Sequence, residues 1–199
     1  MTDQSPGGTG QASADEAEES PTGVGHALQP VVGLGGSAGA IPALVEFLQQ
    51  TRPCGLAYVV ILHLAPEHES TLAELLQRHT DMPVHQVRDA VEVCPDTVYV
   101  IPPRHLLQMV DGELQLGPLP EDRRGRVAVD LFFRTLADSH GPRATAVVLS
   151  GLDSDGAIGI KRIKEHGGLT IAQDPAEAQH DGMPQAAIAT GMVDWVLRA

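Results

Sequence analysis

The chain has 199 residues, 42% of them hydrophobic and only 3% aromatic. One domain with a core of Val, Leu, Ile and Ala is therefore expected, as in a parallel sheet packed against helices. The formal net charge of −13 argues against nucleic-acid binding. An acidic N-terminus, two isolated cysteines (Cys54 and Cys94) and the lack of an apolar run of ~20 residues predict a cytoplasmic protein with free thiols, no signal peptide and no membrane insertion.

Residues 1–28 are rich in Gly, Ser, Pro and Thr, and they carry five acidic residues but no Lys or Arg. Such a segment has too little apolar surface to offset the chain entropy that folding removes. We therefore expect a disordered acidic tail at 1–28 and one folded domain at 29–199.

Strand and helix patterns alternate from residue 29 onward. Continuous apolar runs predict buried strands and 3.6-residue periodicity predicts helices, which gives a strand at 30–34, a helix at 41–50, a strand at 56–64 and a helix at 70–79. Short strands are expected at 97–103, 105–110 and 113–116, with Asp111-Gly112 as a hairpin turn.

The same alternation returns in the second half of the chain. The expected elements are a helix at 127–140, a strand at 144–151, a helix at 157–168 that ends in a glycine cap, a strand at 169–173, a helix at 184–191 and a strand at 193–197. The pattern predicts an α/β fold: a doubly wound, mostly parallel sheet with helices on both faces and an inserted antiparallel hairpin.

Three polar residues follow predicted strands of this sheet. Ser37 follows the first strand, His63 closes the second, and Asp155 follows the strand at 144–151. Ligands of open α/β sheets bind at the carboxyl ends of the strands. Serine, histidine and aspartate at one edge are the set that a serine hydrolase needs.

The glycine-rich turn after the first strand fits two patterns. Gly33, Gly35 and Ala38 match the dinucleotide fingerprint G-x-G-x-x-G/A, whereas Gly35 to Gly39 match G-x-S-x-G around Ser37. A dinucleotide site wants an acidic residue at the end of the second strand to bind the ribose. This chain has His63 there, which favours a hydrolase, with nucleotide binding as the weaker alternative.

Asp155 also precedes a predicted helix, where an aspartate is most often an N-cap. It is thus a candidate both for capping that helix and for orienting an imidazole, with Asp153 as the fallback for either role. The order Ser37, His63, Asp155 differs from the Ser, Asp, His order of α/β-hydrolases, so the G-x-S-x-G match does not imply that family.

Six motifs stand in order along the chain: VVGLGGSAGAIPAL, VVILHLAPEHESTLAELLQRH, DTVYVIPPRHLL, VDLFFRTLA, VVLSGLDSDGAIGIKRIKEHGG and IAQDPAEAQHDGMPQAAIATG. Through these motifs the chain resembles the catalytic domain of the chemotaxis protein-glutamate methylesterases (CheB) over about residues 31–197. The motif sequences are most similar to those of the esterase domains of CheB/CheR fusion proteins.

The resemblance implies a hydrolase that removes methyl esters from glutamate side chains of chemoreceptors and deamidates certain glutamines. Its partners would be methylated chemoreceptor cytoplasmic domains and a CheR-type methyltransferase; no cofactor or metal is implied. The alternative is a catalytically idle CheB-like module that only binds partners.

The resemblance also assigns roles to individual residues. Ser37 would be the nucleophile, His63 the general base and acid, and Asp155 the orienting carboxylate. The backbone N–H groups of Ala38 and Leu152 would form the oxyanion hole, and the loop Gly182, Met183 and Pro184 would line the substrate cleft. Ala40 departs from the family, which has a second glycine after the serine.

Overall fold

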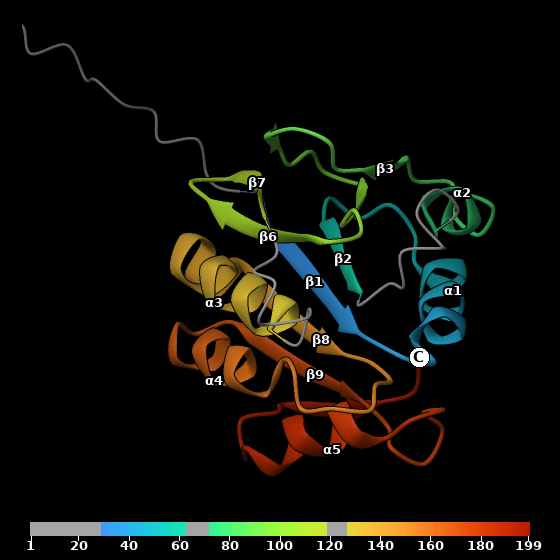
Figure 1. Cartoon of the computed structure of the whole chain (residues 1–199), viewed down its shortest axis with the longest axis vertical. Coiled ribbons are helices and arrows are strands. Elements are labelled where there is room, and N and C mark those ends of the chain that lie inside the picture. Colours follow the sequence, from blue (N-terminus) through green and yellow to red (C-terminus); the bar gives the residue numbers. More distant parts are fainter. Residues whose placement is uncertain (1–28, 63–71, 119–126) are drawn as a thin grey trace, which may run out of the picture.

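The computed structural model describes residues 29–62, 72–118 and 127–199 (Figure 1). The predicted tail at 1–28 lies outside the described residues. A parallel sheet of seven strands, in the order β10-β9-β8-β1-β2-β5-β3, forms the centre of the fold. Its strands are β1 (Val31–Gly36), β2 (Ala57–Leu62), β3 (Val84–Gln86), β5 (Val98–Val100), β8 (Ala144–Val148), β9 (Leu169–Gln173) and β10 (Trp195–Leu197).

A second, antiparallel sheet has the strand order β4-β7-β6 and contains the predicted hairpin. It consists of β4 (Val91–Glu92), β6 (His105–Val110) and β7 (Glu113–Pro118). The turn between β6 and β7 has φ of 50° at Asp111 and 88° at Gly112, the positive values that a two-residue hairpin turn requires. The doubly wound α/β fold and its inserted hairpin are confirmed, while β3 and β4 were not predicted.

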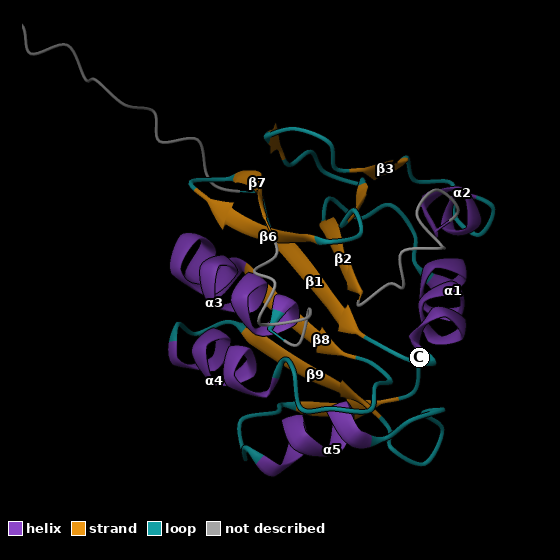
Figure 2. Cartoon of the chain, viewed as in Figure 1, coloured by secondary structure: helices purple, strands orange, loops and turns teal. Residues whose placement is uncertain are grey.

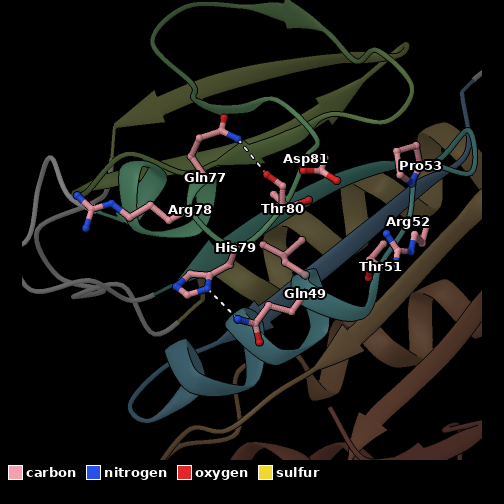
Figure 3. Close-up of a pocket in the computed structure, with 10 residues that line it drawn as sticks. Gln49, Thr51, Arg52, Pro53, Gln77, Arg78, His79, Thr80 and Asp81 are labelled. Atoms are coloured by element: carbon pink, nitrogen blue, oxygen red, sulfur yellow. Dashed lines mark hydrogen bonds between the residues drawn. The ribbon is translucent and has the colours of Figure 1, made fainter.

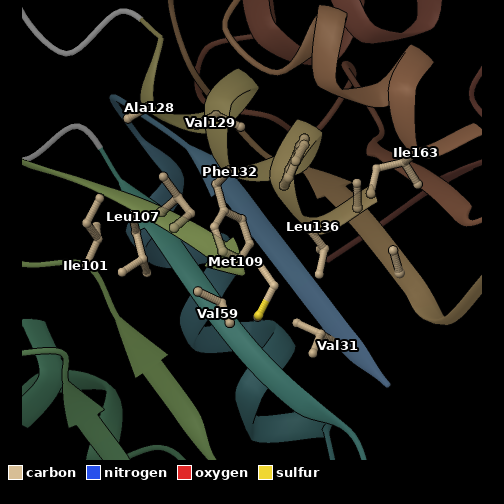
Figure 4. Close-up of a cluster of buried hydrophobic side chains, with 14 of the residues drawn as sticks. Val31, Val59, Ile101, Leu107, Met109, Ala128, Val129, Phe132, Leu136 and Ile163 are labelled. Atoms are coloured by element: carbon tan, nitrogen blue, oxygen red, sulfur yellow. The ribbon is translucent and has the colours of Figure 1, made fainter. Parts of the chain in front are cut away.

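Helices cover both faces of the parallel sheet (Figure 2). They are α1 (Ala40–Gln50), α2 (Leu72–Gln77), α3 (Ala128–His140), α4 (Ala157–Glu165) and α5 (Gly182–Ala189). Leucines of α1 and α2 pack with one face of the sheet in one core cluster. The other cluster includes Phe132 and Phe133 of α3 and Ile163 of α4, and Figure 4 shows Phe132 among its neighbours. In the described part of the chain, no helix is long and apolar enough to cross a membrane.

The glycines of β1 allow α3 to lie directly on the sheet. A Cβ atom at Gly33 would lie 2.9 Å from a ring carbon of Phe133, and one at Gly35 would lie 2.3 Å from Cγ1 of Val129. Any larger side chain there would push α3 away from the strand. Helix packing thus accounts for both glycines without a bound phosphate, which removes the main support for nucleotide binding.

The imidazole of His140, at the end of α3, is buried. Its exposed fraction is 5%, and neither ring nitrogen has a partner among the described residues. Burial, together with the nearby charge of Arg143, lowers the pKa of the imidazole. The folded protein therefore holds His140 neutral at pH values where the unfolded chain binds a proton.

We expect this burial to make folding stability depend on pH. Below about pH 6.5 the unfolded state binds more protons, so stability falls as the pH falls, by up to ~1.4 kcal/mol per pH unit for one group. The His140→Leu variant should lose this contribution. Urea unfolding of both proteins between pH 7.5 and 5 measures it, and the variant should gain relative stability as the pH drops. Parallel pH profiles of the two proteins would contradict the prediction.

Candidate active site

The candidate site lies at the carboxyl end of β1, where the strand order reverses. β1 pairs with β2 on one side and with β8 on the other. Such a switch point is where open α/β sheets bind their ligands. Ser37 directly follows Gly36, the last residue of β1, and Gly36 is paired with Leu62, the last residue of β2. His63 is the next residue in the sequence and lies outside the described residues.

The turn after β1 holds Ser37 against the loop that follows β8. The Ser37 N–H donates to the Ser150 carbonyl at 2.9 Å, and the Ser37 carbonyl accepts from the N–H of Ala40 at 3.2 Å. Gly39 between them has a φ of +74°, a left-handed conformation that favours glycine. Ala40 begins α1, so the family's second glycine falls at a helical position that alanine also fits.

Ser150 is a structural serine beside the predicted nucleophile. Its side chain is fully buried, and its hydroxyl donates to the Ala38 carbonyl and accepts from the His180 N–H, both at 2.9 Å. Gln173 at the end of β9 accepts from the Ser150 N–H. These bonds tie the Ser37 turn to the loop between β9 and α5. Sequence reasoning missed Ser150 because it read as the ordinary end of a strand.

Gly151 is the point of closest approach between the Ser37 turn and α5. A Cβ atom there would lie 2.0 Å from Sδ of Met183 and 3.1 Å from Cβ of Ser37. The Met183 N–H donates to the Gly151 carbonyl, and Gly182 packs against the Leu152 carbonyl. Met183 and Pro184 are buried, and Met183 packs against this loop at Gly151; the role of Gly182, Met183 and Pro184 in a substrate cleft stays a prediction.

Asp155 is almost fully buried, at 3% exposed, in the loop before α4. Its carboxylate accepts three backbone N–H groups: Oδ2 from Val129 at 3.0 Å, and Oδ1 from Asp130 at 2.8 Å and from Gly156 at 3.0 Å. Val129 and Asp130 belong to the first turn of α3. The carboxylate is therefore held in one orientation, in the same loop that packs Gly151 against Ser37.

The expectation that Asp155 caps the helix that follows it is wrong. The N-cap position of α4 is Gly156, which offers no side chain, and the Asp155 carboxylate caps α3 instead. Asp153, the fallback residue, accepts the Asp155 N–H at 3.0 Å and so shapes the loop from within. Because α3 and α4 start side by side, a carboxylate in the loop before α4 reaches the first turn of α3.

The two N–H groups assigned to an oxyanion hole belong to residues that adjoin the contact between Ser37 and Gly151. Ala38 follows Ser37 in the turn, and Leu152 follows Gly151 in the loop after β8. Neither N–H donates a hydrogen bond to any residue that the structure describes. Leu152 is 70% exposed, so this edge of the site is open to a large substrate. Backbone N–H groups that have no acceptor among the described residues are the kind of donor that an oxyanion hole uses; the assignment of these two stays a prediction.

A separate cavity of about 320 Å³ lies at the C-terminal end of α1 (Figure 3), whereas Ser37 precedes the N-terminus of that helix. Polar residues line it, and within it the Gln49 side chain bonds Nδ1 of His79 at 2.9 Å. It also contains Arg52 and Asp81. α1 has 11 residues, so about 16 Å of helix separates the two sites, and the cavity is no part of the candidate active site.

Comparison with known proteins finds the family that the sequence motifs resemble. The model of the CheB methylesterase family matches residues 32–199. The chain is similar to the protein-glutamate methylesterase FrzG of Myxococcus xanthus, with 34% identity over 84% of this chain and 51% of that protein. It is also similar to an uncharacterised 104.1 kDa protein of Rhodobacter capsulatus, with 47% identity over 63% of this chain and 13% of that protein.

A solved structure agrees with the fold. The catalytic domain of the CheB methylesterase of Thermotoga maritima superposes with a TM-score of 0.79 and 28% identity, over 85% of this chain and 92% of that domain. The chain thus spans about half the length of FrzG, but nearly all of a separate catalytic domain. The match over most of the chain in both sequence and structure shows that the chain belongs to the CheB methylesterase family.

Proposed function

We propose that residues 29–199 form a serine-type hydrolase domain that removes methyl esters from glutamate side chains of chemoreceptor-like proteins. The observation that carries the proposal is the contact between two segments: the Ser37 turn is bonded to the loop after β8, and that loop holds the buried Asp155 carboxylate. In the proposal Ser37 is the nucleophile, His63 the general base and Asp155 the carboxylate that orients the imidazole.

The first half-reaction transfers the glutamyl group to the enzyme. His63 takes the proton of the Ser37 hydroxyl as its oxygen attacks the carbonyl carbon of the ester. The carbonyl oxygen becomes negative, and the N–H groups of Ala38 and Leu152 stabilise it. The imidazolium then gives its proton to the methoxy oxygen, the C–O bond breaks, and methanol leaves a glutamyl ester on Ser37.

The second half-reaction restores the serine. A water molecule gives a proton to His63 and attacks the acyl carbon, and the oxyanion forms again at the same N–H groups. When the bond to Ser37 breaks, its oxygen takes the proton back and the product is the free glutamate side chain. Replacing the methoxy group by an amide nitrogen gives glutamine deamidation by the same steps, which the proposal includes.

The proposed substrates are methylated cytoplasmic domains of chemoreceptors or related methylated signalling proteins, with a CheR-type methyltransferase as a partner. The printed name of FrzG, a protein-glutamate methylesterase, supports this class of substrate. Leu152 is 70% exposed and Ser37 is only partly buried, which is compatible with a protein substrate.

Two measurements test the proposed function. A fluorophosphonate probe should label the full chain on one serine, which peptide mass spectrometry should identify as Ser37. Methanol should be released from a methylated chemoreceptor cytoplasmic fragment, and the Ser37→Ala variant should give neither signal. A folded wild-type chain that takes up no probe and releases no methanol would instead support the catalytically idle binding module.

A further inference from the structure

The first turns of α3 and α4 exchange carboxylates. The Asp155 side chain, from the loop before α4, accepts the N–H groups of Val129 and Asp130 in α3. In return, the Asp130 side chain of α3 accepts the N–H of Gly159 in α4 at 2.7 Å. Each carboxylate thus bonds the third N–H of the partner helix, where an N-cap side chain of the same helix would normally bond.

Neither helix supplies this bond from its own N-cap residue. The N-cap residues of α3 and α4 are Val127 and Gly156, and neither makes a side-chain capping bond. The helices also touch at backbone level, because a Cβ at Gly159 would lie 2.5 Å from Cβ of Phe133. Moving one helix end therefore moves the carboxylate that the other helix holds.

We propose that Asp130 is a positioning residue for Asp155: by holding the start of α4, it fixes the loop that carries the Asp155 carboxylate. The inference rests on the proposed function, since it assigns Asp155 the role of orienting His63. Asp130 itself touches no substrate in this scheme. It acts through Gly159 and the backbone between Asp155 and α4.

Asp130 also acts through its negative charge, in addition to its hydrogen bond. The side chain is half-buried, and burial raises its pKa; the negative charge of Asp155 raises it further, while the Gly159 N–H opposes the rise. The positive ends of two helix dipoles compensate for placing two carboxylates together. A second negative charge beside Asp155 favours the protonated imidazole, which is the charged form that the reaction creates.

The experiment compares three variants of the full chain by the pH profile of methanol release. Asp130→Ala removes the bond to Gly159 and the charge; Asp130→Asn keeps an oxygen that can accept the bond. Asp138→Ala is the matched control. It lies on the same helix, where Asp138 pairs with Arg162 of α4 at 2.8 Å, so its loss also weakens contact between the two helices but leaves the Asp155 loop alone.

Asp130→Ala should lower kcat about 10- to 100-fold with little change in KM. The acid limb of its kcat/KM profile should move to lower pH, because a displaced Asp155 stabilises the imidazolium less. Asp130→Asn should recover most of kcat while keeping a smaller shift in the same direction. Asp138→Ala should keep both the rate and the acid limb of the wild type, even where its melting temperature falls.

Each outcome either supports or overturns the inference about Asp130. Unchanged kcat and acid limb in Asp130→Ala, or equal effects of Asp130→Ala and Asp138→Ala, would overturn the inference. If Asp130→Ala does not fold, the acid limb of Asp130→Asn decides: a shift to lower pH supports the inference and no shift overturns it. Failure of the proposed function is a separate observation, because then the wild-type chain itself neither binds the fluorophosphonate nor releases methanol.

Discussion

Replacing Asp155 by asparagine is expected to reduce the rate of methanol release on the order of 10³- to 10⁴-fold, as loss of the orienting carboxylate does in serine hydrolases. Stability should fall as well. The carboxylate accepts three backbone N–H groups through two oxygens. An asparagine keeps one acceptor oxygen but turns its NH2 group toward another donor, which costs about 1–3 kcal/mol.

Asp155→Ala extends the argument, since it removes every bond to the start of α3. We expect its rate to be as low as that of Asp155→Asn and its free energy of unfolding to fall by about 2–4 kcal/mol. Chemical denaturation measures this difference. Equal stability of the two variants and the wild type would show that the cap of α3 does not depend on this side chain.

The control for Asp155 is its neighbour Asp153. Asp153→Asn keeps an oxygen that can accept the Asp155 N–H, so its rate should stay within about 10-fold of the wild type. A larger loss in Asp153→Asn than in Asp155→Asn would transfer the orienting role to Asp153. The rates of Asp153→Asn and Asp155→Asn therefore decide which of the two aspartates orients the imidazole, a question that the sequence left open.

Local rules predicted the main elements well. Continuous apolar runs marked β1, β2 and β8, and the Asp111-Gly112 pair marked the hairpin. The glycine cap of α4 is present too, because Gly167 has a φ of +79° and its N–H bonds the Lys164 carbonyl. The strands β3 and β4 were missed since they have three and two residues, too few for any periodicity.

The site was harder to predict, because its geometry depends on contacts between distant segments. The rule that an aspartate caps the helix after it fails at Asp155, whose partners lie 26 and 25 residues earlier in the chain. Asp130 appeared only as part of a helical pattern. No local signal marked either carboxylate as a cap of the other helix, because the exchange arises only when α3 and α4 start side by side.

The glycines of the first turn show the same limit. Gly33 and Gly35 belong to a nucleotide fingerprint in the sequence, and Gly35 also belongs to the nucleophile pattern, yet both glycines contact α3 in the fold. His63, the residue after the second strand, favoured the hydrolase. That argument holds only where the first two strands are neighbours, because the carboxyl ends of neighbouring parallel strands lie at the same edge of the sheet. The parallel pairing of Gly36 with Leu62 supports that reasoning.

Ser37 and Ser150 are neighbours in the fold, and variants of these two serines should separate an effect on the reaction rate from an effect on the free energy of unfolding. The Ser37 hydroxyl makes no hydrogen bond to any described residue, so Ser37→Ala should keep the free energy of unfolding within about 0.5 kcal/mol. Its methanol release should fall by on the order of 10³-fold or more. Fluorophosphonate labelling should disappear.

Ser150→Ala should do the reverse, although Ser150 lies next to Ser37 and its carbonyl accepts the Ser37 N–H. Its buried hydroxyl bonds both the Ala38 carbonyl and the His180 N–H. Removing it leaves two backbone groups without a partner, so unfolding free energy should fall by about 2–3 kcal/mol. The nucleophile stays, so labelling continues and the rate falls only about 10- to 100-fold through displacement of the turn. A stable but inactive Ser150→Ala, beside an active Ser37→Ala, would move the nucleophile from β1 to β8.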